Sequence, residues 1–149
     1  MRIRRFEDIE GWQVARQLMN HTYALTSARG FETDWDLRRQ MRRASVSAIA
    51  NIAEGFQSGT HPEFARFLRF AQRSTGEIQS HLYVALDQTY IEDPAFESLY
   101  ALSARTSALI GGFIRFLDAG GILAPSSKPL PRRIHPNEAR STRNEPDAG

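Results

Sequence analysis

One stretch of the chain, RRASVSAIANIAEGF over residues 42–56, carries side chains that could bind a ligand or take part in chemistry. It combines arginines with Ser45, Ser47, Asn51 and Glu54 among small apolar residues, at helical spacing. Guanidinium groups bind phosphate, whereas amides, hydroxyls and a carboxylate can form hydrogen bonds with a polar ligand or with one another. Three interpretations follow: a catalytic site, a nucleic-acid surface, or a helix that packs against several neighbours.

Seven arginines form two groups that are candidates for nucleic-acid binding. Arginines clustered on one exposed helix face are the electrostatic footprint of phosphate recognition. The alternative is an ordinary solvated face, because acidic residues lie close by in the sequence, and both interpretations stay open. No aromatic residues alternate with basic ones on a predicted exposed face, so we do not expect bases to stack there. The candidates are Arg38, Arg39, Arg42 and Arg43 in one group and Arg66, Arg69 and Arg73 in the other.

A line of polar residues predicts either a ligand site or a structural network. Arg43, Asn51 and Glu54 fall on one side of the helix predicted around residues 42–56, and Glu77 lies in the next helix. Charged groups that face each other between helices often satisfy one another and fix the helix register. We favour a structural network over binding of a phosphate or another polar ligand.

Catalytic and metal sites find little support in the sequence. The chain has no cysteine, and its four histidines lie at no spacing that provides a set of metal ligands. None of the serines lies in a Gly-x-Ser-x-Gly turn, and no glycine-rich loop carries the lysine of phosphate-binding loops. We therefore predict that the protein is not an enzyme and needs no metal or cofactor.

Four helical segments, and no strand, are predicted to position these residues. In each segment apolar residues recur every three or four positions, the period of a helix with one buried face. Short connections make sequence neighbours antiparallel neighbours in space. The sequence therefore predicts an all-α protein, an up-down-up-down antiparallel four-helix bundle. The helices are expected over residues 9–28, 35–54, 60–90 and from 93 to the glycines at 120–121.

Local signals mark the ends of these helices. Asp8 is the expected N-cap of the first helix, and Thr33 or Asp34 that of the second. Gly55 is expected to follow the second helix and to turn the chain. Thr60 begins a capping-box pattern with a proline in the first turn, which is a strong start signal for the third helix.

The second predicted helix has a wider non-polar surface than one bundle requires. Beyond its core face it carries a further arc that contains Val46, Ala50 and Ala53. A bundle helix normally needs a narrower apolar stripe, and alanines allow a partner backbone to approach closely. We therefore predict that this arc contacts a second copy of the chain.

Length and composition fit one globular domain of 149 residues, 41% of them hydrophobic and 24% charged. No apolar run approaches the roughly 18 residues of a membrane span, and no apolar segment follows the basic start, so we expect a cytoplasmic protein. We divide the chain into an N-terminal extension over residues 1–8, the bundle over 9–120 and a tail over 121–149. The tail is rich in proline and arginine and is expected to be disordered.

The second predicted helix also carries a resemblance to a known family. The string Leu37–Gly55 resembles the signature of the four-helix bundle proteins encoded in 23S ribosomal RNA intervening sequences. The similarity runs from about Phe6 to Leu117 and includes the block EFARFL at residues 63–68. Arg73 departs from the family pattern, as does the pair Gly111-Gly112. This pair predicts either a bend in the fourth helix or the close approach of another backbone, and we favour the close approach because the apolar pattern stays in phase.

The resemblance implies a small all-helical subunit that assembles into a ring, with a homopentamer as the family's form. It also implies kinship with accessory proteins of diversity-generating retroelements, which bind nucleic acid and a reverse transcriptase. The proteins of the intervening sequences have no settled activity. We therefore predict a structural, self-assembling protein that binds RNA or DNA through its arginine faces with low sequence specificity. The alternative is an assembly or adaptor protein that contacts a protein partner such as a polymerase or reverse transcriptase.

Overall fold

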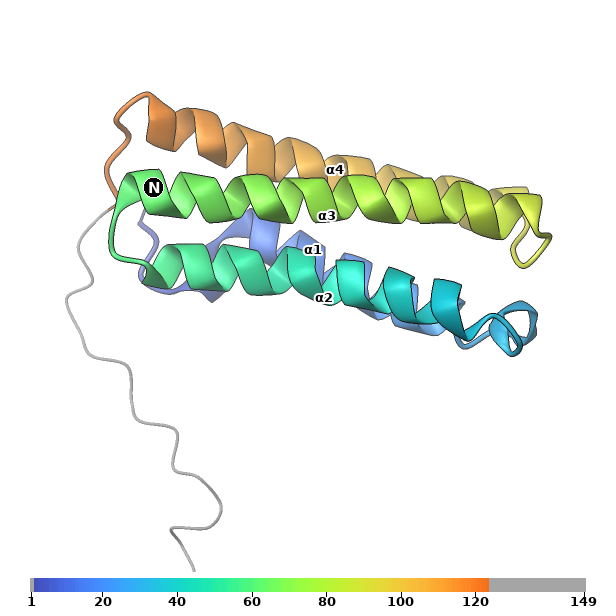
Figure 1. Ribbon diagram of the computed structural model, residues 1–149. Helices are drawn as coiled ribbons and strands as arrows, with labels where there is room; N and C mark the ends of the chain where they lie inside the picture. The colour runs from blue at the N-terminus through green and yellow to red at the C-terminus, as the bar shows by residue number, and fades with distance from the viewer. Residues whose placement is uncertain (1, 124–149) are drawn as a thin grey trace, which may run out of the picture.

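A computed structural model describes residues 2–123, which form four long helices and two short 3-10 turns (Figure 1). No strand occurs in this range, so the predicted all-α, up-down-up-down antiparallel bundle is confirmed. The tail predicted over residues 121–149 lies outside the described residues from position 124 onward. In chain order the elements are η1 (Phe6–Asp8), α1 (Glu10–Leu25), η2 (Arg29–Phe31), α2 (Trp35–Gln57), α3 (His61–Asp87) and α4 (Asp93–Asp118).

The residues that precede α1 pack onto the bundle. Ile3 is buried in the same hydrophobic cluster as residues of all four helices. The prediction that Asp8 caps α1 is wrong, because the chain forms η1 first and Ile9 takes the N-cap position. The Asp8 carboxylate instead accepts the backbone N–H groups of Arg4 and Arg5, at 2.9 and 3.2 Å. It therefore holds η1 rather than α1.

α2 begins and ends for different reasons. Asp34 is its N-cap, since the backbone N–H of Leu37 donates to the Asp34 carboxylate at 3.1 Å. The prediction that Gly55 follows the helix is wrong, because α2 continues to Gln57. A Cβ atom on Gly55 would lie 2.7 Å from the ring of Phe64 and 2.7 Å from Cβ of Phe67. Gly55 therefore allows α3 to approach α2 closely.

α3 starts with only half of the predicted capping box. Thr60 occupies the N-cap, and its hydroxyl accepts the backbone N–H of Glu63 at 3.4 Å. The Glu63 carboxylate turns instead to Arg66, one helical turn further along. The cap and the proline at the first turn still fix where the helix begins.

The core consists of two hydrophobic clusters, one toward each end of the bundle. The cluster nearer the N-terminus of α1 contains Ile52, Leu68 and Ile110, and the other contains Leu18, Met41 and Leu82. The hydroxyls of the buried threonines and serines donate to helix carbonyls, as between Ser103 and the carbonyl oxygen of Thr75 at 2.8 Å. Polar groups can therefore lie in the core without losing their hydrogen bonds.

The predicted close approach of another backbone at Gly111 is wrong, because the atoms nearest to this glycine belong to side chains. A Cβ atom on Gly111 would lie 2.9 Å from Nε2 of Gln72, which donates to the carbonyl oxygen of Ser107 at 3.1 Å. A Cβ atom on Gly112 would meet only the guanidinium of Arg115, at 3.8 Å. α4 continues through both glycines to Asp118.

Across residues 2–123, no helix combines the length and apolarity that crossing a membrane requires.

Candidate nucleic-acid interface

The end of α1 and the first half of α2 bring two aromatic rings and four arginines to one surface groove. The two helices are antiparallel, so the last turn of α1 lies beside the first turns of α2 (Figure 1). We name this site the α1–α2 groove. It is lined by Tyr23 of α1 and by Trp35, Arg38, Arg39, Arg42 and Arg43 of α2.

Arg42 is held in this groove by uncharged partners. Its Nε donates to the hydroxyl of Thr26 at 2.9 Å, and its Nη2 donates to the hydroxyl of Ser27 at 3.1 Å. Its Cζ lies 4.6 Å from the centroid of the Tyr23 ring, a cation–π contact. These contacts fix the guanidinium in space and leave its positive charge unbalanced.

The four arginines of the groove differ in how their charge is balanced. Arg39 pairs with Asp36 at 3.0 Å, and Arg43 pairs with Glu77 at 3.7 Å. Across residues 2–123, neither Arg38 nor Arg42 has a carboxylate oxygen within 4.0 Å. The groove therefore carries about two positive charges without an acidic partner.

The aromatic part of the groove contradicts the expectation from sequence. Trp35 is 68% exposed, and the Cζ of Arg38 lies 5.3 Å from its ring centroid. Tyr23, 39% exposed, lies beside Arg42. The prediction that no aromatic residue accompanies the exposed arginines is therefore wrong. The i, i+3 spacing of Trp35 and Arg38 could have revealed half of the arrangement, but Tyr23 comes from another helix.

The second predicted group, on the outer face of α3, has less unbalanced charge. Arg66 forms an ion pair with Glu63, and the hydrogen bond from Arg66 holds the pKa of Glu63 below its usual value. Arg69 pairs with Asp118 of α4 at 2.7 Å. Two of the three predicted arginines are therefore already matched by carboxylates.

Arg73 faces a shallow groove between α3 and α4. This groove also contains Arg69, Gln72 and Arg115. Neither Arg73 nor Arg115 has a carboxylate within 4.0 Å in the described part of the chain. Sequence reasoning missed Arg115, because no other arginine lies within two turns of it in α4 and it meets Arg69 and Arg73 only through helix packing.

The predicted polar line does not form one network. Asn51 donates to both the carbonyl oxygen and the hydroxyl of Ser47, at 2.9 and 3.0 Å. Ser74 of α3 donates to the same Ser47 hydroxyl at 3.0 Å. Asn51, Ser47 and Ser74 therefore connect α2 to α3, and no described contact extends this link to Arg43 or Glu77.

The charged members of the polar line lie apart from that link. Arg43 and Glu77 form a half-exposed pair, whereas Glu54 is exposed and takes no hydrogen bond or ion pair among residues 2–123. His81, one turn after Glu77, is half-buried, and its Nε2 is buried without a partner in the described structure. Burial lowers the pKa of His81, although the nearby Glu77 acts in the opposite direction.

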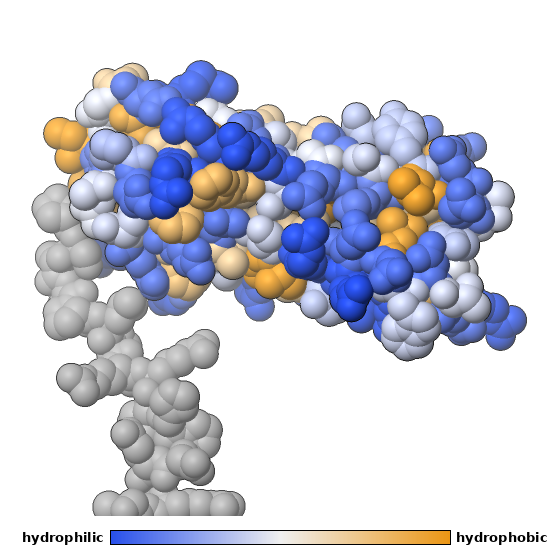
Figure 2. Space-filling view, in the orientation of Figure 1, coloured by the Kyte–Doolittle hydropathy of each residue, from blue (hydrophilic) through white to orange (hydrophobic). Residues whose placement is uncertain are grey.

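The residues predicted to contact a second copy lie on α2. Val46 is 40% exposed, and Ala50 and Ala53 are half-buried. Viewed from the side of α2 and α3, the surface shows small hydrophobic patches separated by hydrophilic side chains (Figure 2).

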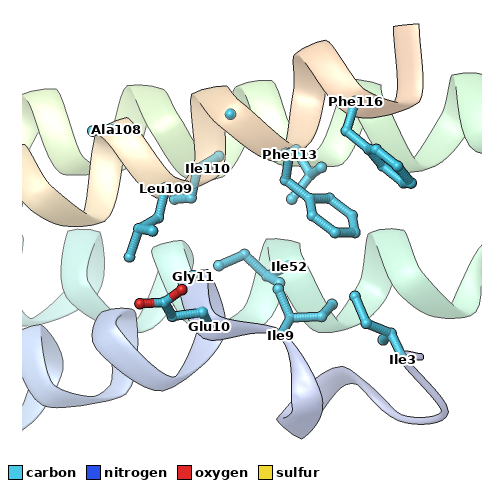
Figure 3. Close-up of a pocket in the computed structure, with 12 residues that line it drawn as sticks. Ile3, Ile9, Glu10, Gly11, Ile52, Ala108, Leu109, Ile110, Phe113 and Phe116 are labelled. Carbon is cyan, nitrogen blue, oxygen red and sulfur yellow. The ribbon is translucent and has the colours of Figure 1, made fainter. Parts of the chain in front are cut away.

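An apolar cavity of about 270 Å³ lies between the N-terminal segment, the start of α1 and α4 (Figure 3). Ile9, Phe113 and Phe116 line it. Among the described residues that line it, Glu10 is the only ionisable one, and its carboxylate lies 3.7 Å from the guanidinium of Arg105. Within residues 2–123, no group of three or more histidine or acidic residues could hold a metal ion. The cavity therefore lacks the convergent ionisable groups of an acid–base site.

Comparison with known proteins bears on both the fold and the family. The family described as 23S rRNA-intervening sequence protein has a model that matches residues 7–112. A similar solved structure is the crystal structure of a protein with unknown function from the S23 ribosomal protein family of Bacteroides thetaiotaomicron. It is 23% identical, with 70% of this chain and 94% of that chain covered and a TM-score of 0.61, a likeness of fold. No curated protein matches the chain.

Proposed function

The chain belongs to the 23S rRNA-intervening sequence protein family, and we propose that it is a non-enzymatic bundle that binds RNA or DNA through the α1–α2 groove. One observation carries the proposal. Arg38 and Arg42 are placed by aromatic rings and hydroxyl groups and have no acidic partner among the described residues. Guanidinium groups held in this way are free to pair with phosphate oxygens.

The chemistry of the groove favours the phosphate backbone over base edges. An arginine that is already positioned loses little side-chain entropy when a phosphate binds. Phosphate contacts fix the position of a nucleic acid but carry no sequence information. We therefore expect binding with low sequence specificity. The α3 arginines support the proposal less, because Glu63 and Asp118 already pair with Arg66 and Arg69.

The salt dependence of binding tests this proposal. Affinity for a fluorescent RNA oligonucleotide, measured by anisotropy between low and physiological salt, should fall steeply as salt rises. The double variant Arg38→Glu/Arg42→Glu should weaken binding and flatten the salt dependence. Arg66→Glu/Arg69→Glu changes the net charge equally, but at positions that carboxylates already balance, and should weaken binding less.

Two results would contradict the proposal. One is absence of binding by the wild-type protein at low salt. The other is equal loss in both double variants, because equal loss would mean that net charge alone attracts the nucleic acid. Circular dichroism of each variant should retain the helical signal, since all four side chains are at least partly exposed.

We further propose that copies of the chain associate through the arc of Val46, Ala50 and Ala53, with the family's pentamer as the expected form. The support is the exposure of Val46 on α2 beside two small residues. A ring would repeat the α1–α2 groove once per subunit and strengthen weak phosphate contacts by multivalency. The mass from light scattering should exceed that of a monomer and fall in Val46→Glu but not in Ala104→Glu, an exposed control on α4. A monomeric wild-type protein at high concentration would refute this.

A further inference from the structure

We infer that the α1–α2 groove takes single-stranded nucleic acid rather than a duplex, with one base stacked on the ring of Trp35. The inference rests on the proposed nucleic-acid binding and adds the form of the ligand. It is carried by the aromatic rings of the groove, whereas the proposed function is carried by its charges.

Most of Trp35 is exposed to solvent rather than packed against the bundle. It is the first residue of α2 and is 68% exposed, and none of the described aromatic rings pairs with it. The other tryptophan, Trp12, is half-buried, with its ring 5.2 Å from that of Phe6 in an edge-to-face contact. An exposed tryptophan does not gain the stabilisation that burial of its large apolar ring normally provides.

The groove combines the two features that bind a single strand. Such sites provide positive charge along the backbone and aromatic faces on which bases stack. Here Arg38 lies over Trp35 and Arg42 lies over Tyr23, so each ring stands next to a cation that has no carboxylate partner in the described chain. A phosphate on the cation would bring the adjoining base close to the ring.

A duplex would use only half of this arrangement. In a duplex the faces of the bases are stacked on one another, so an exposed tryptophan cannot reach them unless the helix opens. The arginines would still contact duplex phosphates. The stacking face of Trp35 therefore favours a strand whose bases are free.

The fluorescence of Trp35 provides a direct test. The chain has two tryptophans, so Trp12→Phe leaves Trp35 as the single reporter. Titration with a short oligouridylate should quench this fluorescence, whereas a duplex with the same number of phosphates should bind more weakly and quench little. Equal quenching by the duplex would overturn the inference.

Variants separate stacking from charge. Trp35→Ala should lower the single-strand affinity about 5- to 150-fold, the range that one stacked base is worth, and leave the salt dependence nearly unchanged. Trp35→Phe should restore most of the affinity, because a phenyl face still stacks. Arg42→Glu should instead flatten the salt dependence.

The outcomes distinguish this inference from the proposed function. If Trp35→Ala binds as the wild type does but Arg38→Glu/Arg42→Glu fails to bind, the stacking inference falls and phosphate binding stands. If the wild-type protein binds neither ligand, both fall. If Trp35→Ala changes the mass of the assembly and not the affinity, Trp35 belongs to a protein interface, and the inference is again overturned.

Discussion

Gly55 lies near the C-terminal end of α2 and Gly76 lies in the middle of α3, and alanine should change the stability in opposite directions at the two positions. At Gly55 the new Cβ would lie 2.7 Å from the Phe64 ring, 2.7 Å from Cβ of Phe67 and 3.2 Å from the carbonyl oxygen of Phe64. At Gly76 of α3, a new Cβ would have no atom within 4 Å. Both substitutions replace a helical glycine, so they form a matched pair that isolates the contact between α2 and α3.

The magnitudes follow from two opposing effects. Alanine stabilises a helix by about 1 kcal/mol relative to glycine where there is room, so Gly76→Ala should gain about that amount. At Gly55 the buried Phe64 ring or the backbone of α3 has to move, and overpacking of this kind costs roughly 1–3 kcal/mol. Gly55→Ala should therefore lose up to about 2 kcal/mol, and the two variants should differ by roughly 1–3 kcal/mol.

Urea denaturation followed by circular dichroism measures both free energies of unfolding. If the protein assembles, both variants and the wild type have to be compared at one concentration, since association adds to apparent stability. Gly55→Ala with the same or higher stability than Gly76→Ala would refute the reasoning, because the close approach of α3 would then not depend on the missing side chain.

Three further predictions concern capping and titration. Asp34→Ala should lower the free energy of unfolding by about 0.5–2 kcal/mol, since it removes the cap of α2. Urea denaturation measures this change, and an unchanged free energy would contradict the prediction. The hydrogen bond from the Tyr90 hydroxyl to Asp34 raises the pKa of Tyr90. The contribution of this hydrogen bond to the stability of the fold should therefore be complete below about pH 10 and lost as the pH rises through the raised pKa. Ultraviolet titration should place the ionisation of Tyr90 lower in Asp34→Asn. Burial lowers the pKa of His81, so as the pH falls the unfolded state binds the proton before the folded state does. The free energy of unfolding should therefore decrease below about pH 6.5. Urea denaturation at several pH values should show a weaker pH dependence of stability in His81→Gln.

Local chemistry determined the helices and their order. The period of apolar residues identified the four helices, and short connections made them antiparallel. Thr60 could be recognised as a cap, and Asp34 as one of two candidates beside Thr33, because an N-cap side chain accepts a backbone N–H two or three residues ahead. The candidate arginines could be found from their spacing, because residues three or four apart share a helix face.

The tertiary structure decided which residues meet across helices. Gly55 looked like a helix end because glycine commonly follows one, yet a neighbouring helix needs the space of its missing side chain. Tyr23 joins the arginines of α2 only because α1 is antiparallel to α2.

The balance of charge also depends on partners far apart in the chain. Arg69 meets Asp118 and Arg43 meets Glu77 across the bundle, whereas Arg38 and Arg42 meet no described carboxylate. Sequence could therefore supply the arginines and the helices that carry them. Which guanidinium groups keep an unpaired charge, and which rings stand beside them, depends on helix packing, because those distances are set by atoms many residues away.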